Sequence, residues 1–242
     1  MIRKIAFVSS LFIGCLACKQ QTGNNAKLSN RETSVDMAEP KSGMPLKFLA
    51  LGDSYTIGES VDTAERWPVV LAERLKEKGL SIEMPEIIAT TGWTTDELKQ
   101  GIEKARPNGS YELVSLLIGV NNQYRGYETA VYEREFQELL DIAISFATKR
   151  SRVFVVSIPD YGVTPFGKEK DPEKISQEID LYNEIKKNLS AKARVQYFDI
   201  TGISRQAAHD PELVAGDGLH PSGKMYRQWV DIILPGVEKM LE

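Results

Sequence analysis

The chain has few residues of the kinds that build disulfides and metal centres. Its 242 residues include two cysteines, Cys15 and Cys18, and both lie in the first 18 positions. From Lys19 onward the chain therefore offers no thiol for an internal disulfide or a cysteine-ligated metal. Histidine also occurs only twice, which excludes a histidine-rich metal centre.

A basic excess is also missing. Lysine and arginine number 30 against 34 aspartates and glutamates, so the formal net charge is −4. Proteins that bind nucleic acids usually carry a basic stripe or patch, and we expect no nucleic-acid partner. The hydrophobic fraction of 42% is sufficient for one α/β domain with a sizeable core.

The N-terminus lacks the apolar length of a membrane-spanning helix. Arg3 and Lys4 precede residues 5–17, an uncharged and mostly apolar stretch of 13 residues, whereas a spanning helix needs roughly 20. A basic start followed by a short apolar core is typical of a signal peptide. We therefore predict a signal peptide over residues 1–17.

Cys18 directly follows this segment and the small residue Ala17. The arrangement resembles a bacterial lipoprotein leader, in which the cysteine is lipidated and becomes the new N-terminus, although Cys15 stands where such leaders usually carry leucine. Cleavage before Cys15 and an ordinary secretory signal are the alternatives. Lipidation of Cys18 predicts a cell-envelope protein that meets the membrane only through its lipid anchor, facing the periplasm or the cell surface.

Residues 18–45 are polar and hold only scattered apolar side chains. Such a segment buries too little apolar surface to offset the entropy of ordering it, so we predict a flexible tether. A single domain follows over residues 46–242, and a monomer is the expected state.

Within that domain, short apolar runs alternate with amphipathic stretches. The runs predict β-strands at 46–51, 82–89, 113–118, 152–158 and 195–200, with the second interrupted by Pro85. The amphipathic stretches predict helices at 67–78, 95–104, 127–149, 171–188 and 222–241. This alternation predicts an α/β fold with helices on both faces of a parallel sheet. We expect a three-layer α/β/α sandwich with a parallel, flavodoxin-like, five-stranded sheet. Residues that carry chemistry should then follow the carboxyl ends of the strands.

Three residues with catalytic chemistry follow the first three predicted strands. Ser54 comes after the first strand on a glycine turn that can expose its hydroxyl. Gly92 follows the second strand, where a glycine lets the backbone N–H approach a ligand closely. Asn121 follows the third, and its side-chain amide can donate to a developing oxyanion. Taken singly, each is more often part of a turn or a helix cap.

A fourth motif lies near the C-terminus. Asp217 stands three residues before His220, a spacing at which a carboxylate can reach the imidazole Nδ1 in a compact loop. A serine hydroxyl is a poor nucleophile without a base, so His220 supplies what Ser54 needs. The alternative is a loop histidine that caps the last helix.

In this order, the motifs GDSY, TTGW, IGVNN and DGLHP resemble those of the SGNH (GDSL-type) hydrolase family. The resemblance extends from about residue 46 to the C-terminus. Its four signature positions fall on Ser54, Gly92, Asn121 and His220. Two positions depart from the usual pattern, because Tyr55 stands where leucine is common and Asn122 where aspartate is usual.

The resemblance implies hydrolysis of carboxylic esters through an acyl-enzyme, with no metal or organic cofactor. Ser54 would be the nucleophile, His220 the general base and Asp217 the carboxylate that orients it. The oxyanion hole would consist of the backbone N–H groups of Ser54 and Gly92 and the side chain of Asn121.

The substrate class stays open among small-molecule, lipid and glycan esters. A short-chain or aryl esterase, a lysophospholipase, a carbohydrate O-deacetylase and an acyltransferase would share the same residues. An alternative of another class is a non-catalytic envelope protein that binds a glycan or a lipid on this scaffold.

The remaining candidates are aromatic or titratable. Four aromatic residues follow predicted strands and either line the substrate pocket or only pack their loops; they are Trp93, Tyr124, Tyr161 and Phe166. Asp53 is interpreted as a turn-stabilising residue, and His209 as a surface or loop residue.

Overall fold

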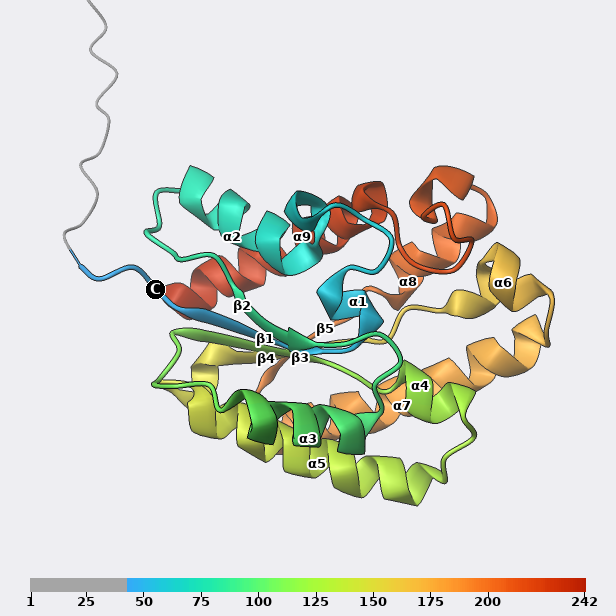
Figure 1. Ribbon diagram of the computed structural model, residues 1–242, viewed down its shortest axis with the longest axis horizontal. Helices are drawn as coiled ribbons and strands as arrows, with labels where there is room; N and C mark the ends of the chain where they lie inside the picture. The colour runs from blue at the N-terminus through green and yellow to red at the C-terminus, as the bar shows by residue number, and fades with distance from the viewer. Residues whose placement is uncertain (1–42) are drawn as a thin grey trace, which may run out of the picture. The chain divides into compact units, whose positions relative to one another are not determined.

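The structure is a computed structural model that describes residues 43–242. A central sheet organises this part of the chain. Five strands pair in parallel in the order β2-β1-β3-β4-β5 (Figure 1). Their bounds are Phe48–Gly52 (β1), Glu86–Ala89 (β2), Leu113–Leu117 (β3), Val153–Val156 (β4) and Gln196–Phe198 (β5). This is the flavodoxin-like order, with a switch point between β1 and β3. The predicted signal peptide, Cys18 and all of the predicted tether before residue 43 lie outside the described residues.

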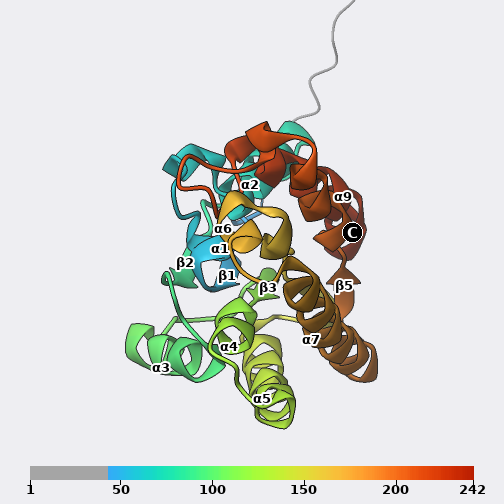
Figure 2. The ribbon, with the colours of Figure 1, turned by 90° about the vertical axis from the view of Figure 1, so that its right-hand side faces the viewer.

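Helices cover both faces of the sheet, which confirms the predicted three-layer α/β/α sandwich (Figures 1 and 2). Helices α2 (Trp67–Glu77) and α9 (Gly223–Leu241) pack against each other on one face. The other face carries α3 (Thr95–Ala105), α5 (Thr129–Phe146) and α7 (Pro172–Ala193), with α5 contacting both of the others.

Short helices fill several of the connections. They are α1 (Ser54–Ile57), α4 (Val120–Tyr124), α6 (Pro165–Lys168) and α8 (Thr201–Ser204), together with the 3₁₀ turns η1 (Thr63–Glu65), η2 (Arg150–Arg152), η3 (Tyr161–Val163), η4 (Arg205–Ala208) and η5 (Pro211–Leu213). None was predicted, because apolar periodicity needs a window of about 11–18 residues to show itself.

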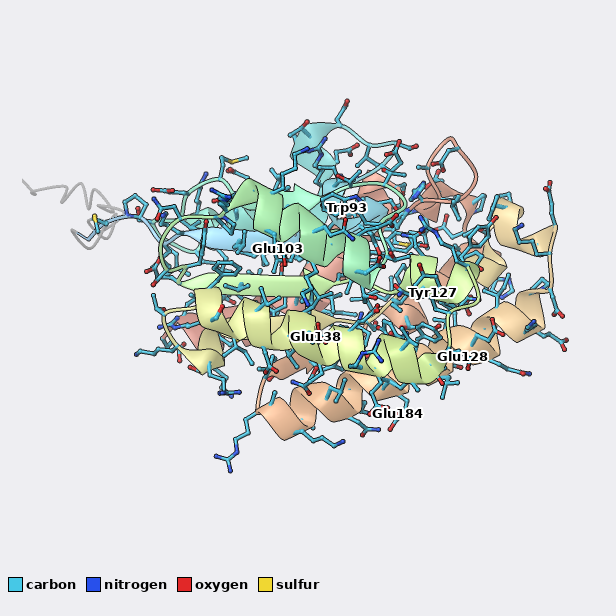
Figure 3. The ribbon with its side chains drawn as sticks, turned by 60° about the horizontal axis from the view of Figure 1, so that its bottom comes forward. Trp93, Glu103, Tyr127, Glu128, Glu138 and Glu184 are labelled. Carbon is cyan, nitrogen blue, oxygen red and sulfur yellow. The ribbon has the colours of Figure 1, made fainter. Side chains whose placement is uncertain are left out.

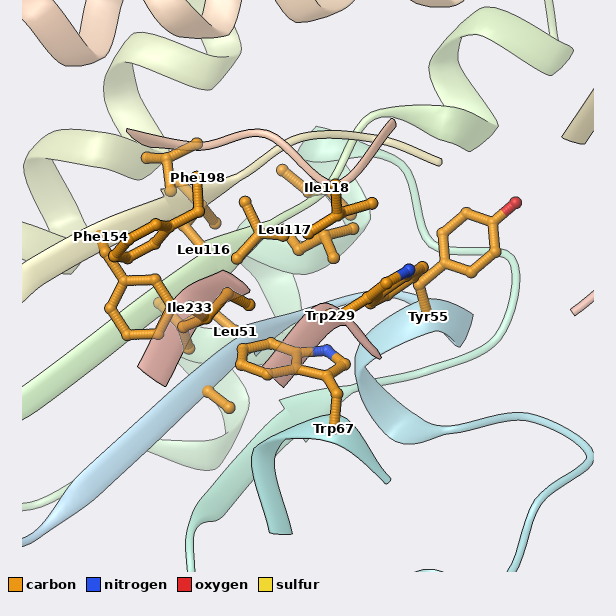
Figure 4. Packing of buried hydrophobic residues seen from close by; sticks show 14 of the residues in the cluster. Leu51, Tyr55, Trp67, Leu116, Leu117, Ile118, Phe154, Phe198, Trp229 and Ile233 are labelled. Carbon is orange, nitrogen blue, oxygen red and sulfur yellow. The ribbon is translucent and has the colours of Figure 1, made fainter. Parts of the chain in front are cut away.

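The core lies on both sides of three continuously buried strands. Every residue of β1, β3 and β4 is buried, as expected for parallel strands with helices on both faces. Trp67 of α2 packs on Phe154 of β4, with ring centroids 6.2 Å apart. Trp229 of α9 extends this cluster to Tyr55 in α1, at 6.4 Å between centroids (Figure 4). The aromatic core therefore supports the helix that begins with Ser54.

The second strand is shorter than the predicted span 82–89. Its regular pairing begins at Glu86, directly after Pro85, and only an isolated bridge joins Ile82 to Leu46. Proline has no N–H to donate to a hydrogen-bond ladder between strands, so the second strand is interrupted at Pro85.

Two long helices differ from the prediction at their ends. The span 127–149 is too long, because α5 ends at Phe146 and the chain then bridges alongside Tyr111, ahead of β3. The span 171–188 is too short, because α7 continues to Ala193 and ends at Arg194, which takes a left-handed conformation. The buried side chain of Ser190 lies in this extension, and the buried Lys186 lies just before it.

The outward side of the α3, α5 and α7 layer is charged. Glu103 of α3, Glu138 of α5 and Glu184 of α7 are among its acidic residues (Figure 3). Lys99 of α3 bridges to Glu138 at 2.6 Å, which ties two neighbouring helices together across this surface. No helix within residues 43–242 has both the length and the hydropathy that a membrane crossing requires.

Candidate active site

The first strand delivers Ser54 to the edge of the sheet where all strands end. Gly52, the last residue of β1, pairs in register with Ala89 of β2 and Leu117 of β3. A Cβ atom on Gly52 would lie 2.5 Å from the carbonyl oxygen of Leu117, so only glycine fits this close turn. Asp53 then caps α1 by accepting the N–H of Tyr55 at 3.1 Å, and Ser54 is the first residue of that helix.

The four predicted signature residues line one pocket. Ser54, Gly92, Asn121 and His220 surround a cavity of about 180 Å³. Ser54 and Asn121 follow β1 and β3, the two strands that flank the switch point, which is where ligands bind in open parallel sheets. Residues that are up to 166 positions apart in the sequence are therefore brought to one place.

His220 is held by the carboxylate predicted to orient it. Its Nδ1 lies 2.6 Å from Asp217 Oδ2, and its backbone N–H donates to Asp217 Oδ1 at 3.0 Å. The ring also packs on Tyr55, edge to face, with centroids 5.8 Å apart. The carboxylate and the aromatic ring together fix the imidazole plane, which leaves Nε2 as the nitrogen available to a reacting group.

No direct hydrogen bond joins the Ser54 hydroxyl to His220 in the described part of the chain, although both line the same cavity. Contacts of this kind are often long until a substrate is bound.

The Asp217 carboxylate is held in its ionised form. Partial burial alone would raise its pKa. Hydrogen bonds from the His220 ring, from the Ser60 hydroxyl and from the backbone N–H groups of His220 and Leu219 outweigh burial, and they hold the pKa of Asp217 well below its usual range. An ionised carboxylate beside the imidazole is what a Ser-His-Asp arrangement requires.

The loop after β2 presents Gly92 to the pocket. Its φ of +88° lies in the left-handed region, which favours glycine. The Arg125 guanidinium donates to the Gly92 carbonyl at 2.7 Å, and Asn121 Nδ2 donates to the Trp93 carbonyl at 2.9 Å. An asparagine amide has two N–H groups, so Asn121 retains one that can face a substrate oxygen.

The asparagine at 122 has a structural explanation. Its side chain is fully buried, accepts the N–H of Thr95 at 3.1 Å and donates to Thr95 Oγ1 at 2.7 Å. The Thr95 hydroxyl gives its own proton to Glu135. Its partner at 122 must therefore donate, which an amide does and an ionised aspartate cannot.

Asp53 occupies a different environment from Asp217. It is fully buried, and its Oδ2 has no hydrogen-bond partner among the described residues. Burial raises the pKa of Asp53 to about 7, against the lowering effects of the Tyr55 N–H and the Lys186 charge. Lys186 is itself fully buried and donates to the Val156 carbonyl at 2.7 Å. Asp53 caps α1 and does not line the pocket, in agreement with a turn-stabilising role.

The predicted aromatic residues divide between pocket and core. Tyr124, Tyr161 and Phe166 line the cavity, with ring centroids 6.2–6.3 Å apart. Trp93 does not line it, because its indole packs over Gly101 of α3, where a Cβ would meet the ring at 2.2 Å. His209 lies at the end of η4, away from the residues that line the cavity.

Sequence reasoning missed three residues that support the site. Ser60 donates to Asp217, Glu59 accepts from Thr91, and Arg125 binds the Gly92 carbonyl. No pattern in the sequence marks them, because each meets its partner only through the fold. Within residues 43–242, no three His, Cys, Asp or Glu side chains are grouped to hold a metal ion.

A flavodoxin-like sheet has a serine, a histidine held by an aspartate, and an asparagine amide at one pocket beside its switch point, which are the parts that an esterase or lipase site requires. The chain belongs to the GDSL-like lipase/acylhydrolase family, whose model matches residues 50–228. This confirms the resemblance read from the four motifs and makes an ester hydrolase the general assignment.

Comparisons with individual proteins agree with the family. An arylesterase of Vibrio mimicus is 23% identical over 178 residues, covering 72% of this chain and 80% of that protein. The fold is similar to a lipase from a goat rumen metagenome, with a TM-score of 0.64 and 15% identity over 81% of this chain and 100% of that one. It is also similar to an acetyl xylan esterase from Geobacillus stearothermophilus, with a TM-score of 0.58 and 19% identity over 81% and 95% of the two chains.

Proposed function

We propose that this protein is a serine esterase that hydrolyses carboxylic esters through an acyl-enzyme on Ser54. One observation carries the proposal: Ser54, Gly92, Asn121 and His220 line a single pocket while Asp217 holds the imidazole at 2.6 Å. Nucleophile, base, orienting carboxylate and oxyanion donors are thus within one site.

In the first half of the reaction, the Ser54 oxygen attacks the ester carbonyl while His220 takes the hydroxyl proton. The oxyanion receives hydrogen bonds from the backbone N–H groups of Ser54 and Gly92 and from Asn121. The carbon–oxygen bond to the alcohol then breaks, and the imidazolium returns its proton to the departing alkoxide. Water repeats the sequence on the acyl-enzyme and releases the acid.

The size of the pocket supports a small acyl group. A cavity of about 180 Å³ is below the about 300–1,000 Å³ typical of pockets for drug-sized ligands. The aromatic wall of Tyr124, Tyr161 and Phe166 suits an acetyl or aryl ester better than a long chain. We therefore place short-chain and aryl esters first and carbohydrate O-acetyl esters second, with lysophospholipids last.

Hydrolysis of p-nitrophenyl esters from acetate to palmitate, by wild type and Ser54→Ala side by side, tests the proposal. We expect activity that falls with acyl length and disappears in the variant. Activity that persists in a folded Ser54→Ala protein would remove Ser54 as the nucleophile. A folded wild type that cleaves no ester would favour the non-catalytic glycan- or lipid-binding alternative or a strict acyltransferase.

We further propose that the protein is a monomeric lipoprotein of the bacterial cell envelope, anchored through Cys18 after removal of residues 1–17. The proposal rests on the sequence pattern around Cys18. Metabolic labelling with an alkyne-tagged palmitate, comparing wild type with Cys18→Ala, should give label only in wild type. Labelling that survives the substitution points to Cys15, and release into the medium without label indicates a secreted protein.

A further inference from the structure

Two neighbouring residues between α1 and η1 contact two different loops that supply residues to the pocket. The Ser60 hydroxyl donates to Asp217 Oδ2 at 2.7 Å, which is the same oxygen that holds His220 Nδ1. The Glu59 carboxylate accepts from the hydroxyl of Thr91, which directly precedes Gly92. One dipeptide therefore touches the loop of the general base and the loop of an oxyanion donor.

The same dipeptide is tied to the nucleophile. The backbone N–H groups of Gly58 and Glu59 both donate to the Ser54 carbonyl at 3.0 Å. Ser60 has a φ of 65°, a left-handed conformation that few non-glycine residues adopt. Its hydroxyl reaches Asp217, 157 positions along the chain, from this conformation. Such an outlier is a reason to look for a function.

Neither side chain lines the cavity itself. The contact between Ser60 and Asp217 restrains the rotation of the carboxylate that orients the imidazole. The contact between Glu59 and Thr91 restrains the peptide that carries the Gly92 N–H. Both contacts act on groups whose alignment matters in the transition state, and an error of about 1 Å in such alignment can cost about 100-fold in rate.

We propose that Glu59 and Ser60 are positioning residues that hold the Asp217–His220 loop and the Thr91–Gly92 loop in place around Ser54. This inference rests on the proposed function, since it assigns these residues a part in the same reaction. It predicts losses in kcat with little change in KM, because neither residue contacts the substrate.

Ser60→Gly isolates the hydroxyl, because glycine accepts the left-handed conformation without strain. We expect kcat on p-nitrophenyl acetate to fall about three- to tenfold, as the lost hydrogen bond to a carboxylate is partly exposed. Ser60→Asn tolerates the same conformation and can still donate, so it should recover at least half of the wild-type kcat. An unchanged kcat in Ser60→Gly, or an equal loss in both variants, would overturn the role of the hydroxyl.

Glu59→Ala tests the other contact, with Glu59→Gln as the variant that can still accept from Thr91. We expect a fall of about threefold in kcat for alanine and a smaller one for glutamine. If the dipeptide acts as one unit, the double variant Glu59→Ala/Ser60→Gly should lose less than the product of the two single losses. Losses that multiply would show two independent contacts and would overturn the unit.

Asp62→Asn is the matched control in the same segment. Asp62 is exposed and its side chain makes no hydrogen bond or salt bridge among the described residues, so kcat and thermal stability should match wild type. The rate of Ser54 labelling by a fluorophosphonate reads nucleophile activation without any ester substrate. If wild type cleaves no ester but is labelled, the choice of substrate fails while positioning is still measured. If Ser60→Gly is labelled as fast as wild type, positioning by the hydroxyl fails.

Discussion

Two aspartates lie beside the site in opposite environments. Asp217 is partly exposed and its two oxygens receive hydrogen bonds from His220, Ser60 and Leu219. Asp53 directly precedes Ser54, yet it is fully buried and leaves one oxygen unpaired within residues 43–242. These hydrogen bonds hold the pKa of Asp217 well below its usual range, whereas burial raises the pKa of Asp53 to about 7. Proximity in sequence to Ser54 therefore does not identify the carboxylate that serves the base.

Two adjacent asparagines repeat the contrast. Asn121 lines the pocket, whereas Asn122 is fully buried and bonds Thr95 at the start of α3. Asn121 lines the pocket and Asp217 holds His220, which lines it, so both are assigned to chemistry. Their fully buried counterparts Asn122 and Asp53 are assigned to the fold. Substitutions at the four positions can break this division or sharpen it.

Asp217→Asn is expected to have the largest effect. The amide keeps the shape of the carboxylate but cannot stabilise an imidazolium and favours the wrong tautomer of His220. We expect kcat to fall about 10⁴-fold, by analogy with other Ser-His-Asp sites. The free energy of unfolding should also fall, because the ionised carboxylate accepts hydrogen bonds that an amide replaces only in part. Steady-state kinetics and urea denaturation measure the two quantities. A large loss of stability with intact kcat would place Asp217 with Asp53.

Asn121→Ala should reduce kcat by about 10²–10³-fold, because it removes one oxyanion donor. KM should change less, since this donor matters most once charge develops on the carbonyl oxygen. Steady-state kinetics on p-nitrophenyl acetate measure kcat and KM separately and so test this expectation. A rise in KM alone would make Asn121 a substrate-binding residue.

Asn122→Ala should act on stability instead of rate. It leaves the buried N–H of Thr95 without a partner, which costs about 1–3 kcal/mol. Equilibrium denaturation with urea measures the loss, and kcat of the folded fraction should stay within about twofold of wild type. A loss of kcat as large as that of Asn121→Ala would contradict the division between the two asparagines.

Asp53→Asn should change the pH dependence of stability. Because burial raises the pKa of Asp53 from 3.8 to about 7, the folded state keeps a proton that the unfolded state loses between these values. The stability linked to this group is complete below about pH 4 and is lost as the pH rises towards 7, by on the order of 4 kcal/mol. Asparagine removes that loss. Denaturation curves at pH 4.5 and 6.5 test it, and equal slopes for the two proteins would exclude Asp53 as the titrating group.

The sequence predicts the fold and the position of the site better than the residues that hold the site in place. The alternation of strands with helices and the position of the site follow from the apolar runs of β1, β3 and β4 and from the motifs placed after strands, and those patterns are local. The interruption of the second strand at Pro85 is also predicted from the sequence, because proline has no N–H for the ladder. By contrast, Ser60 meets Asp217 from 157 positions away, and the exposed segment that carries it shows no periodicity. The burial of Lys186 was equally hidden, because a lysine in a helical pattern is usually exposed.

Trapping the acyl-enzyme tests directly whether Ser54 is the nucleophile. The domain is mixed with p-nitrophenyl acetate, quenched in acid within the first turnovers, and its peptides are mapped by mass spectrometry. We expect wild type to give a stoichiometric burst of p-nitrophenol and an acetyl group on Ser54, and Ser54→Ala to give neither. Two results would contradict Ser54 as the nucleophile. One is ester cleavage that gives no burst and leaves no acetyl group on Ser54, and the other is an acetyl group that forms on a different residue in step with turnover.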